Sequence, residues 1–573
     1  MTAPGVMGRP DPALMRPPKE VMRLARMGAS FPTRLSFMRS LVRRLAREAW
    51  RFEVARFDLD EEGYGTVLLS AEGPERVYTL VGFSHALAPE KRTDRVIAEE
   101  WDATFSLFDG VPGEADIERL RANTPRQEAG RFMPSDLVLA RANKSLRLFD
   151  HIADSLAAGR QPSIEQVASV GYLMRTTAVY GSGKFGCADR EKLAGRPETR
   201  GAFQVELLTV YLIRWFTILL IEHVARKRGG GRAVALDPAL RRHLGIGNAT
   251  GLGMAPFLIK HPALTDAWVT ARETALARVR GLTAASPETA AAFRRMLARA
   301  RCHVGEWGVE DAEQTARIFV LRSEMAELEA WCESGGLAAA APWDALYRFA
   351  ANKFSLEGQE MTLALILEPH GPLIDDLADG MFAVEDGRLD PAMPVGRLRA
   401  LIEERYDWAL AIDFGKPEAQ GRFWYYSEEK LEPRLGDRHR DAGGELEMPL
   451  AAGRDAAALH AALAGYDAAA PVADLLRARP DLRHAVRRVQ AVADHAYAEI
   501  RDNLVDGAVR PIDLLRFKLA FFGAAKFDPK SDLWTRITMF QGAPLPEDLA
   551  APGADDWAFP VAPATPTASA VVS

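Results

Sequence analysis

Apolar residues recur at helical spacing along most of this 573-residue chain, and this spacing predicts a mainly helical protein. Long helices are predicted over 135–158, 164–179, 205–228, 263–281, 287–301 and 309–332. The sequence Ser334-Gly335-Gly336 is a stop signal and a plausible boundary. Beyond it, helices are predicted over 343–352, 359–368, 373–381, 398–411, 455–505 and 511–526.

Strand-like patterning is confined to the segment 51–110. Short runs of β-type residues occur at 52–57, 66–71 and 77–83, with turn sequences between them. Residues 96–108 fit either a helix or a strand. We therefore predict a mainly α fold of the α+β class, with a small antiparallel sheet near the N-terminus and helices on one of its faces.

The length of the chain predicts two to four domains. We expect a flexible basic arm, a small α+β module, a helical domain with Gly-rich loops, a second helical region and a disordered tail, over 1–30, 31–125, 126–336, 337–545 and 546–573. Within the second helical region, 413–454 is rich in glycine and charge and predicts an irregular insertion. Its aromatic run at 423–426 suits a lid or a partner-binding surface.

Two segments raise the question of membrane contact. Residues 21–51 are basic and partly amphipathic, which predicts a first helix that packs on the body and exposes a basic face; targeting or binding to a membrane surface is the alternative. Residues 205–225 are apolar over a spanning length but contain Glu206, Arg214 and Glu222. Charged groups are costly in lipid, so we predict a core helix and no membrane span.

The composition of the chain indicates which binding partners and which cellular compartment to expect. The formal net charge of −6 gives no reason to expect nucleic acid as a partner. Three cysteines, far apart in sequence, form neither a metal motif nor a disulfide framework, which favours a cytoplasmic location. The 11 histidines lack metal-site spacing, so no metal is predicted. The sequence predicts no particular cofactor, and a homo-oligomer is possible.

Lysine is scarce, which makes its placement informative. Only 13 of the 72 basic residues are lysines, and three of them stand between a small or amide residue and a phenylalanine, at Lys184, Lys353 and Lys526. An ammonium group can bind an anion as a point charge, or act as a nucleophile when it is desolvated. These lysines are therefore candidate site residues.

Two Gly-rich segments are candidate anion-binding loops. The first, 180–186, contains Gly183 and Lys184 but lacks the spacing and the Ser or Thr of a nucleotide phosphate loop. Its amides and Lys184 could still face an anion; a plain connector is the alternative. The second, 245–253, follows a polar helical segment, which argues against a dinucleotide fold. We interpret it as a tight loop in which Asn248 and Thr250 donate to a ligand.

Two further segments carry candidate proton-transfer groups. His261 is a candidate acid or base, although it could equally cap a helix. Asn352, Lys353 and Glu357 lie within six residues and form either a polar cluster or a helix end with capping side chains. A buried Lys353 without a carboxylate partner would have a lowered pKa and could form a Schiff base.

Together these residues predict one anion-binding pocket. Lys184, Asn248, Lys353 and Lys526 would surround a small anionic metabolite, Arg175 or Arg200 would pair with its charge, and His261 or Glu357 would move protons. The predicted function is an enzyme, such as a lyase, isomerase or transferase. The alternatives are an oxidoreductase that binds a nucleotide cofactor outside a Rossmann fold, and a non-catalytic helical scaffold.

Overall fold

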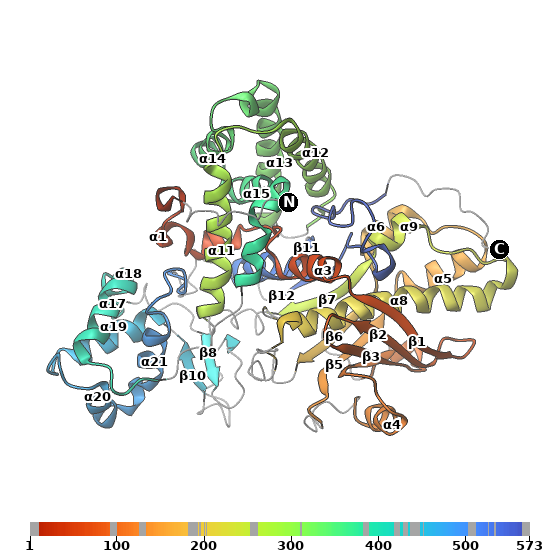
Figure 1. Cartoon of the computed structure of the whole chain (residues 1–573), viewed down its shortest axis with the longest axis horizontal. Coiled ribbons are helices and arrows are strands. Elements are labelled where there is room, and N and C mark those ends of the chain that lie inside the picture. Colours follow the sequence, from red (N-terminus) through yellow and green to blue (C-terminus); the bar gives the residue numbers. More distant parts are fainter. Residues whose placement is uncertain are drawn as a thin grey trace.

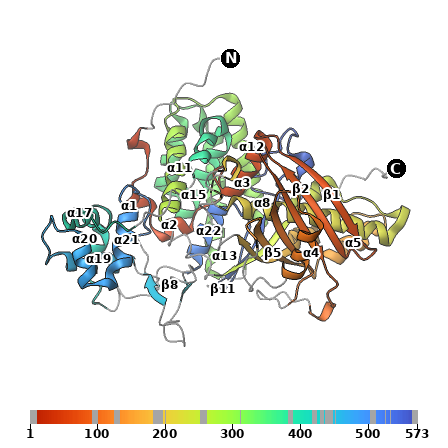
Figure 2. The same cartoon turned by 60° about the horizontal axis from the view of Figure 1, so that its bottom comes forward.

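The computed structural model contains a mixed sheet, a bundle of long helices and a smaller helical unit (Figure 1). The sheet and the smaller unit lie on opposite sides of the bundle (Figure 2). The structure describes residues 11–91, 100–124, 133–181, 193, 196–199, 201, 203–251, 262–309, 312–381, 389–416, 424–427, 434–435, 447–450, 452–501, 511–524, 526–531 and 534–563.

The sheet has nine strands in the order β1-β2-β3-β4-β5-β6-β7-β12-β11. In that order they are Arg51–Leu59, Gly65–Glu72, Val77–Ser84, Ala103–Asp109, Asp136–Lys144, Tyr172–Gly181, Gly245–Gly251, Trp534–Met539 and Lys526–Ser531. All neighbours pair antiparallel except β6 and β7, which are parallel because a long helix connects them. The α+β class is confirmed, whereas the prediction of a small, wholly antiparallel sheet ending by residue 125 is wrong.

Two predicted helices each contain a strand, and a third ends where a strand begins. The segment 135–158 is β5 followed by α5 (Phe149–Ala157); β5 is buried on both faces, so it lacks the alternation that marks a strand. The segment 164–179 is α6 (Ile164–Val170) followed by β6, and 511–526 is α22 (Pro511–Phe522) followed by β11. Gly171 and Gly523 follow these two helices with φ of 79° and 102°, a left-handed conformation that ends a helix.

The long apolar helix α8 (Gln204–Gly229) packs across one face of the sheet, as the core-helix prediction requires. The stretch Gln204–Arg232 is the one described helix that could cross a membrane by length and composition, but 83% of its apolar window is buried inside the protein. The buried guanidinium of Arg214 has partners in the fold. Arg214 donates to the carbonyl oxygens of Leu244 and Ala543 at 2.7 and 2.8 Å.

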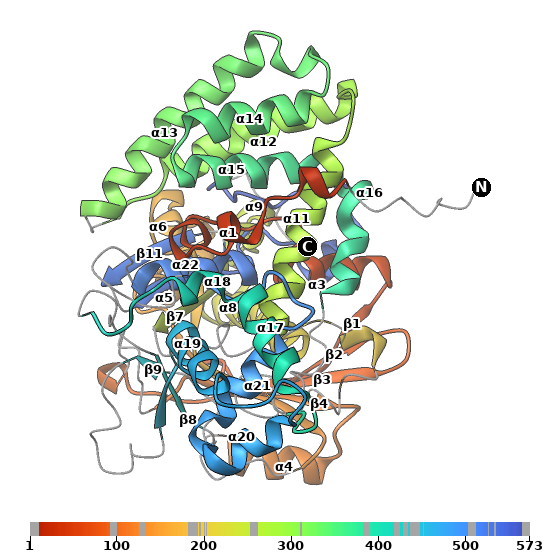
Figure 3. The same ribbon diagram turned by 90° about the vertical axis from the view of Figure 1, so that its left-hand side faces the viewer.

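The helical bundle matches the sequence prediction to within a few residues (Figure 3). It contains α11 (Pro262–Arg280), α12 (Pro287–Gly305), α13 (Ala312–Glu333), α14 (Pro342–Lys353) and α15 (Leu356–Leu367). Local capping explains part of this success. Ser286 accepts a hydrogen bond from the Thr289 amide at 3.2 Å, and Pro287 occupies the first turn of α12.

The smaller unit has a hydrophobic core of its own, which includes Leu398, Leu459 and Val486. Its helices are α17 (Val395–Arg405), α18 (Asp407–Leu410), α19 (Ala452–Leu463), α20 (Val472–Ala478) and α21 (Arg483–Ala491), so the helix predicted over 455–505 is interrupted. The insertion 413–454 was expected to be irregular. Its described strands Trp424–Ser427, Arg434–Leu435 and Glu447–Leu450 instead form a three-stranded sheet.

Both ends of the described chain pack into the body. The guanidinium of Arg16 donates to Glu273 and Glu360 in the core, and Trp557 and Phe559 are buried. The expected flexible arm and disordered tail are therefore wrong for 11–30 and 546–563; residues 1–10 and 564–573 lie outside the described ranges. Helix α3 (Phe37–Arg47) packs on the body as predicted, but its basic face is not solvated, since Arg39 is only 4% exposed.

Candidate functional site

Several predicted site residues cannot be placed. Gly183, Lys184, Arg200 and His261 lie outside the described residues. The expectation that their loops meet in one pocket therefore stays a prediction.

The predicted cluster at 352–357 lies in the helical bundle, away from the sheet. Asn352 and Lys353 are exposed at the end of α14, where the Lys353 ammonium lies 4.9 Å from the centre of the Phe349 ring. An exposed ammonium lacks the desolvation that a Schiff-base lysine needs. Glu357 is buried on α15 and forms ion pairs with Arg516 and, at 3.8 Å, with Arg317. These contacts favour a structural role for Glu357.

The sheet brings the remaining predicted residues onto four neighbouring strands. Arg175 on β6 pairs with Gly247 on β7, Gly247 pairs with Thr538 on β12, and Thr538 pairs with Lys526 on β11. Asn248 is next to Gly247 and donates to the hydroxyl of Thr176 at 2.8 Å. Thr250 lies on the same strand, in register with Thr535. The Gly-rich segment that contains Asn248 and Thr250 is thus a strand, and the prediction of a loop there is wrong.

The glycines of β7 allow side chains from neighbouring strands to approach its backbone closely. Gly245 and Gly247 are two residues apart, so they lie on the same face of the strand. A Cβ atom at Gly247 would lie 2.7 Å from atoms of the Tyr172 ring, and one at Gly245 would lie 2.6 Å from Thr538 Cγ2. The glycine spacing therefore makes room for Tyr172 and Thr538.

Tyr172 and Thr538 line a pocket of about 420 Å³ on this part of the sheet, between α6 and the end of α12. Buried side chains form its floor, namely Tyr172, His243, His303, Trp307, Thr538 and Gln541. Charged side chains of both signs form its rim, namely Arg147, Glu165, Glu306 and Arg536. We take this cavity, called the sheet pocket below, as the candidate functional site.

His243 is a buried imidazole on the floor of the sheet pocket, in contact with Gln541. It ends α9 (Pro238–His243) and is 5% exposed. The side-chain nitrogen of Gln541 lies 3.1 Å from His243 Nε2. A glutamine amide can donate or accept in such a contact, so Gln541 orients the His243 ring in either tautomer.

His303 uses both ring nitrogens in contacts with the protein. Its Nδ1 lies 2.7 Å from the carbonyl oxygen of Pro560 and therefore donates. Its Nε2 accepts a hydrogen bond from the Trp307 indole at 3.3 Å. These contacts fix His303 as a neutral wall residue, so His243 is the better candidate for proton transfer in the sheet pocket.

Sequence reasoning missed most of this pocket. His243 lies two residues before Gly245, where the predicted Gly-rich segment begins, so its position was a usable signal. Gln541 lies 298 residues away from it, and no local pattern indicates their contact. A lowered lysine pKa, which was conditional on burial at Lys353, occurs at Lys518 on α22, where burial lowers the pKa to about 8. Lys518 does not line the sheet pocket.

Within the described ranges, no three His, Cys, Asp or Glu side chains are grouped closely enough to hold a metal ion. Comparison with known proteins gives no matching family model, no matching curated protein and no matching solved structure. The chemistry of the sheet pocket is therefore inferred from its own residues.

Proposed function

We propose that this chain is an enzyme that binds a small anionic metabolite in the sheet pocket, with His243 exchanging a proton with it. The observation that carries this proposal is a buried imidazole on the floor of a cavity whose rim holds two guanidinium groups. A neutral imidazole can accept a proton near pH 7 and return it later. Such a step is common to many lyases, isomerases and transferases.

The rim favours a ligand with little negative charge. Arg147 and Arg536 suit a carboxylate or a phosphate, because guanidinium groups bind both through charge-assisted hydrogen bonds. Glu165 and Glu306 would oppose a second or third negative charge. A monocarboxylate, or an amino acid whose ammonium faces these glutamates, therefore matches the rim better than a polyphosphate does.

The size and lining of the pocket agree with that ligand class. A volume of about 420 Å³ is within the range of small-molecule sites. The rings of Tyr172 and Trp307 offer apolar contact, and the Thr538 hydroxyl offers a donor and an acceptor. A small carboxylate could place its charge at the rim and its reacting carbon near His243.

Thermal-shift screening with mono-, di- and amino-carboxylates tests the proposal, because a ligand that binds only the folded state raises its melting temperature. The Arg147→Gln variant should lose the shift, whereas Arg160→Gln, a matched change at another exposed arginine outside the pocket, should keep it. NMR would then monitor chemical conversion of the bound compound, and His243→Gln should abolish that conversion. An equal shift in Arg147→Gln and wild type would place the ligand elsewhere.

A further inference from the structure

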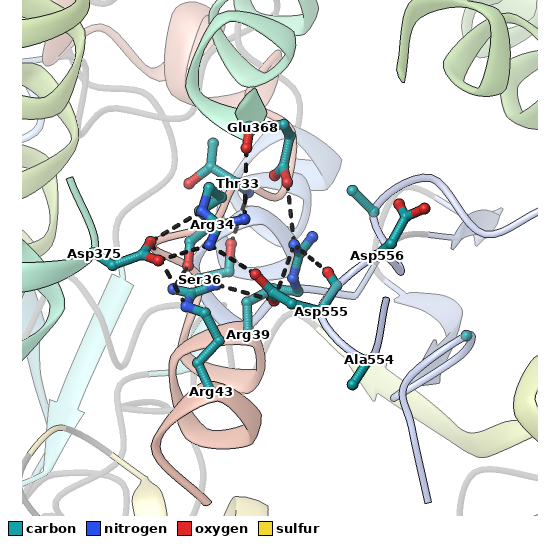
Figure 4. A network of polar contacts seen from close by, with 12 residues as sticks. Thr33, Arg34, Ser36, Arg39, Arg43, Glu368, Asp375, Ala554, Asp555 and Asp556 are labelled. Carbon is teal, nitrogen blue, oxygen red and sulfur yellow. Dashed lines mark hydrogen bonds and ion pairs between the residues drawn. The ribbon is translucent and has the colours of Figure 1, made fainter. Parts of the chain in front are cut away.

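Three arginines near the N-terminal end of the described chain gather around a carboxylate near its C-terminal end (Figure 4). Arg34 Nη2 lies 2.7 Å from Asp555 Oδ2. Arg39 and Arg43, one turn apart on α3, each place a nitrogen 3.6 Å from Asp555 Oδ1. Asp375 lies 2.6 Å from Arg34 and neutralises part of the positive charge of the three arginines.

Glu368 pairs with Arg39 at 3.1 Å, so three carboxylates match the three arginines, but two guanidinium nitrogens still lack a hydrogen bond among the described residues. Arg39 Nε and Arg43 Nη1 are buried without a hydrogen-bond partner in the described structure. Burial, together with the like charge of Arg34, lowers the pKa of Arg43 to about 10, which leaves it protonated at neutral pH. Burial alone would raise the pKa of Asp555, but the surrounding arginines outweigh it and lower the pKa, so Asp555 is ionised.

A cavity of about 600 Å³ lies beside the cluster, between α3, α12 and the segment 549–556. Its lining brings together four guanidinium groups, from Arg34, Arg43, Arg295 and Arg299. Three carboxylates face them, from Glu368, Asp555 and Asp556. We call this cavity the arginine pocket.

The two arginines from α12 differ in their pairing. Arg299 forms an ion pair with Asp556. Arg295 is exposed and has no ion-pair partner among the described residues. The arginine pocket therefore holds an excess of positive charge, and Arg295 can meet a ligand without first losing a contact.

We propose that the arginine pocket is a second binding site, which takes the phosphoryl group of inorganic phosphate or of a phosphate monoester. Guanidinium groups form paired, charge-assisted hydrogen bonds to phosphoryl oxygens, and the single positive charge that the three carboxylates leave over attracts an anion. Asp555 competes with the ligand for Arg34 and Arg43. This site is separate from the sheet pocket and shares no lining residue with it.

Isothermal titration with inorganic phosphate and with phenyl phosphate, at constant ionic strength with chloride as the reference anion, tests this site. Arg295→Gln should weaken binding about tenfold, the effect of losing one charge-assisted contact. Arg294→Gln is the matched control, because this neighbouring arginine is exposed and does not line the pocket. Its affinity should stay within about twofold of wild type.

Two more variants separate this site from its alternatives. Asp555→Asn should tighten phosphate binding several-fold by removing a competing charge, and Arg147→Gln in the sheet pocket should leave it unchanged. Tighter binding of phenyl phosphate than of inorganic phosphate would identify a monoester as the ligand, and the reverse would identify free phosphate. Binding no stronger than that of chloride, or equal affinity in Arg295→Gln and wild type, would overturn the proposal.

Discussion

The ring of Tyr172 lies against the backbone of Gly247, where an added Cβ atom would come within 2.7 Å of three ring atoms. Gly247→Ala must therefore displace the ring, which lines the sheet pocket. We expect this variant to lose about 1–3 kcal/mol in the free energy of unfolding, as overpacked cores do. It should also lose part of the ligand-induced thermal shift.

Urea unfolding of Gly247→Ala and of Gly231→Ala measures this effect. Gly231 has no atom within 4 Å of an added Cβ and an ordinary φ, so its variant should unfold like wild type. Equal stability of the two variants would mean that Tyr172 does not depend on the glycine.

Glu360 is a buried carboxylate held by several guanidinium groups. It accepts from Arg16 and Arg26 at 2.6 and 3.0 Å, and Arg272 lies 3.5 Å away. Replacing it with glutamine leaves buried arginines uncompensated, which costs about 3–5 kcal/mol. Glu327→Gln, at an exposed position, should change stability by less than about 0.5 kcal/mol.

The carboxylate of Glu360 also predicts how the stability of the protein changes at acidic pH. Burial alone would raise the pKa of Glu360, but Arg16 and Arg272 outweigh it and lower the pKa to about 2 from the ordinary 4.5. A lowered pKa contributes stability above 4.5 that is lost as the pH falls toward 2. The free energy of unfolding, measured through that pH range, should fall less steeply in Glu360→Gln than in wild type.

His495 and Asp266 connect the end of the smaller helical unit to α11. The hydrogen bond from His495 Nδ1 to Asp266, at 3.1 Å, raises the pKa of His495 although burial opposes it. A raised pKa contributes stability below the ordinary value of 6.5 that is lost as the pH rises through the folded value. The free energy of unfolding should fall between about pH 5.5 and about pH 8.5. This fall should be smaller in Asp266→Asn. An unchanged slope would contradict the ion pair.

Phe559 tests the packing of the C-terminal segment. The side chain is 5% exposed and its ring centre lies 6.0 Å from that of His303, a wall residue of the sheet pocket. Phe559→Ala should lower the free energy of unfolding by about 3–5 kcal/mol, the cost of a large cavity. Phe319→Ala removes the same ring from a position that is 72% exposed, and thermal unfolding should register little change.

Local patterns predicted the elements whose signals are local. The bundle helices and α8 follow from helical spacing and caps, and β1 to β3 follow from β-type runs with turns between them. Strand β5 was missed because burial on both faces removes the alternation. Strand β12 pairs with β7, which is far away in sequence, so nearby residues do not indicate that the β11–β12 hairpin joins this sheet.

The candidate site likewise combines residues that local sequence patterns indicated with residues that only the fold brings together. The glycine spacing at 245–247 pointed to close packing, and Arg175, Asn248 and Lys526 do lie on neighbouring strands. No local pattern connects His243 with Gln541, because only the folded sheet brings them together. Arginine, and not the scarce lysine, supplies the positive charge of both pockets.

The most direct test of the central claim is a crystal structure of the protein with the monocarboxylate or amino acid that stabilises it most. We predict electron density for the ligand in the sheet pocket, with its carboxylate beside Arg147 or Arg536 and its reacting carbon near His243. Ligand density at another site, with the sheet pocket filled only by solvent, would contradict the proposed function.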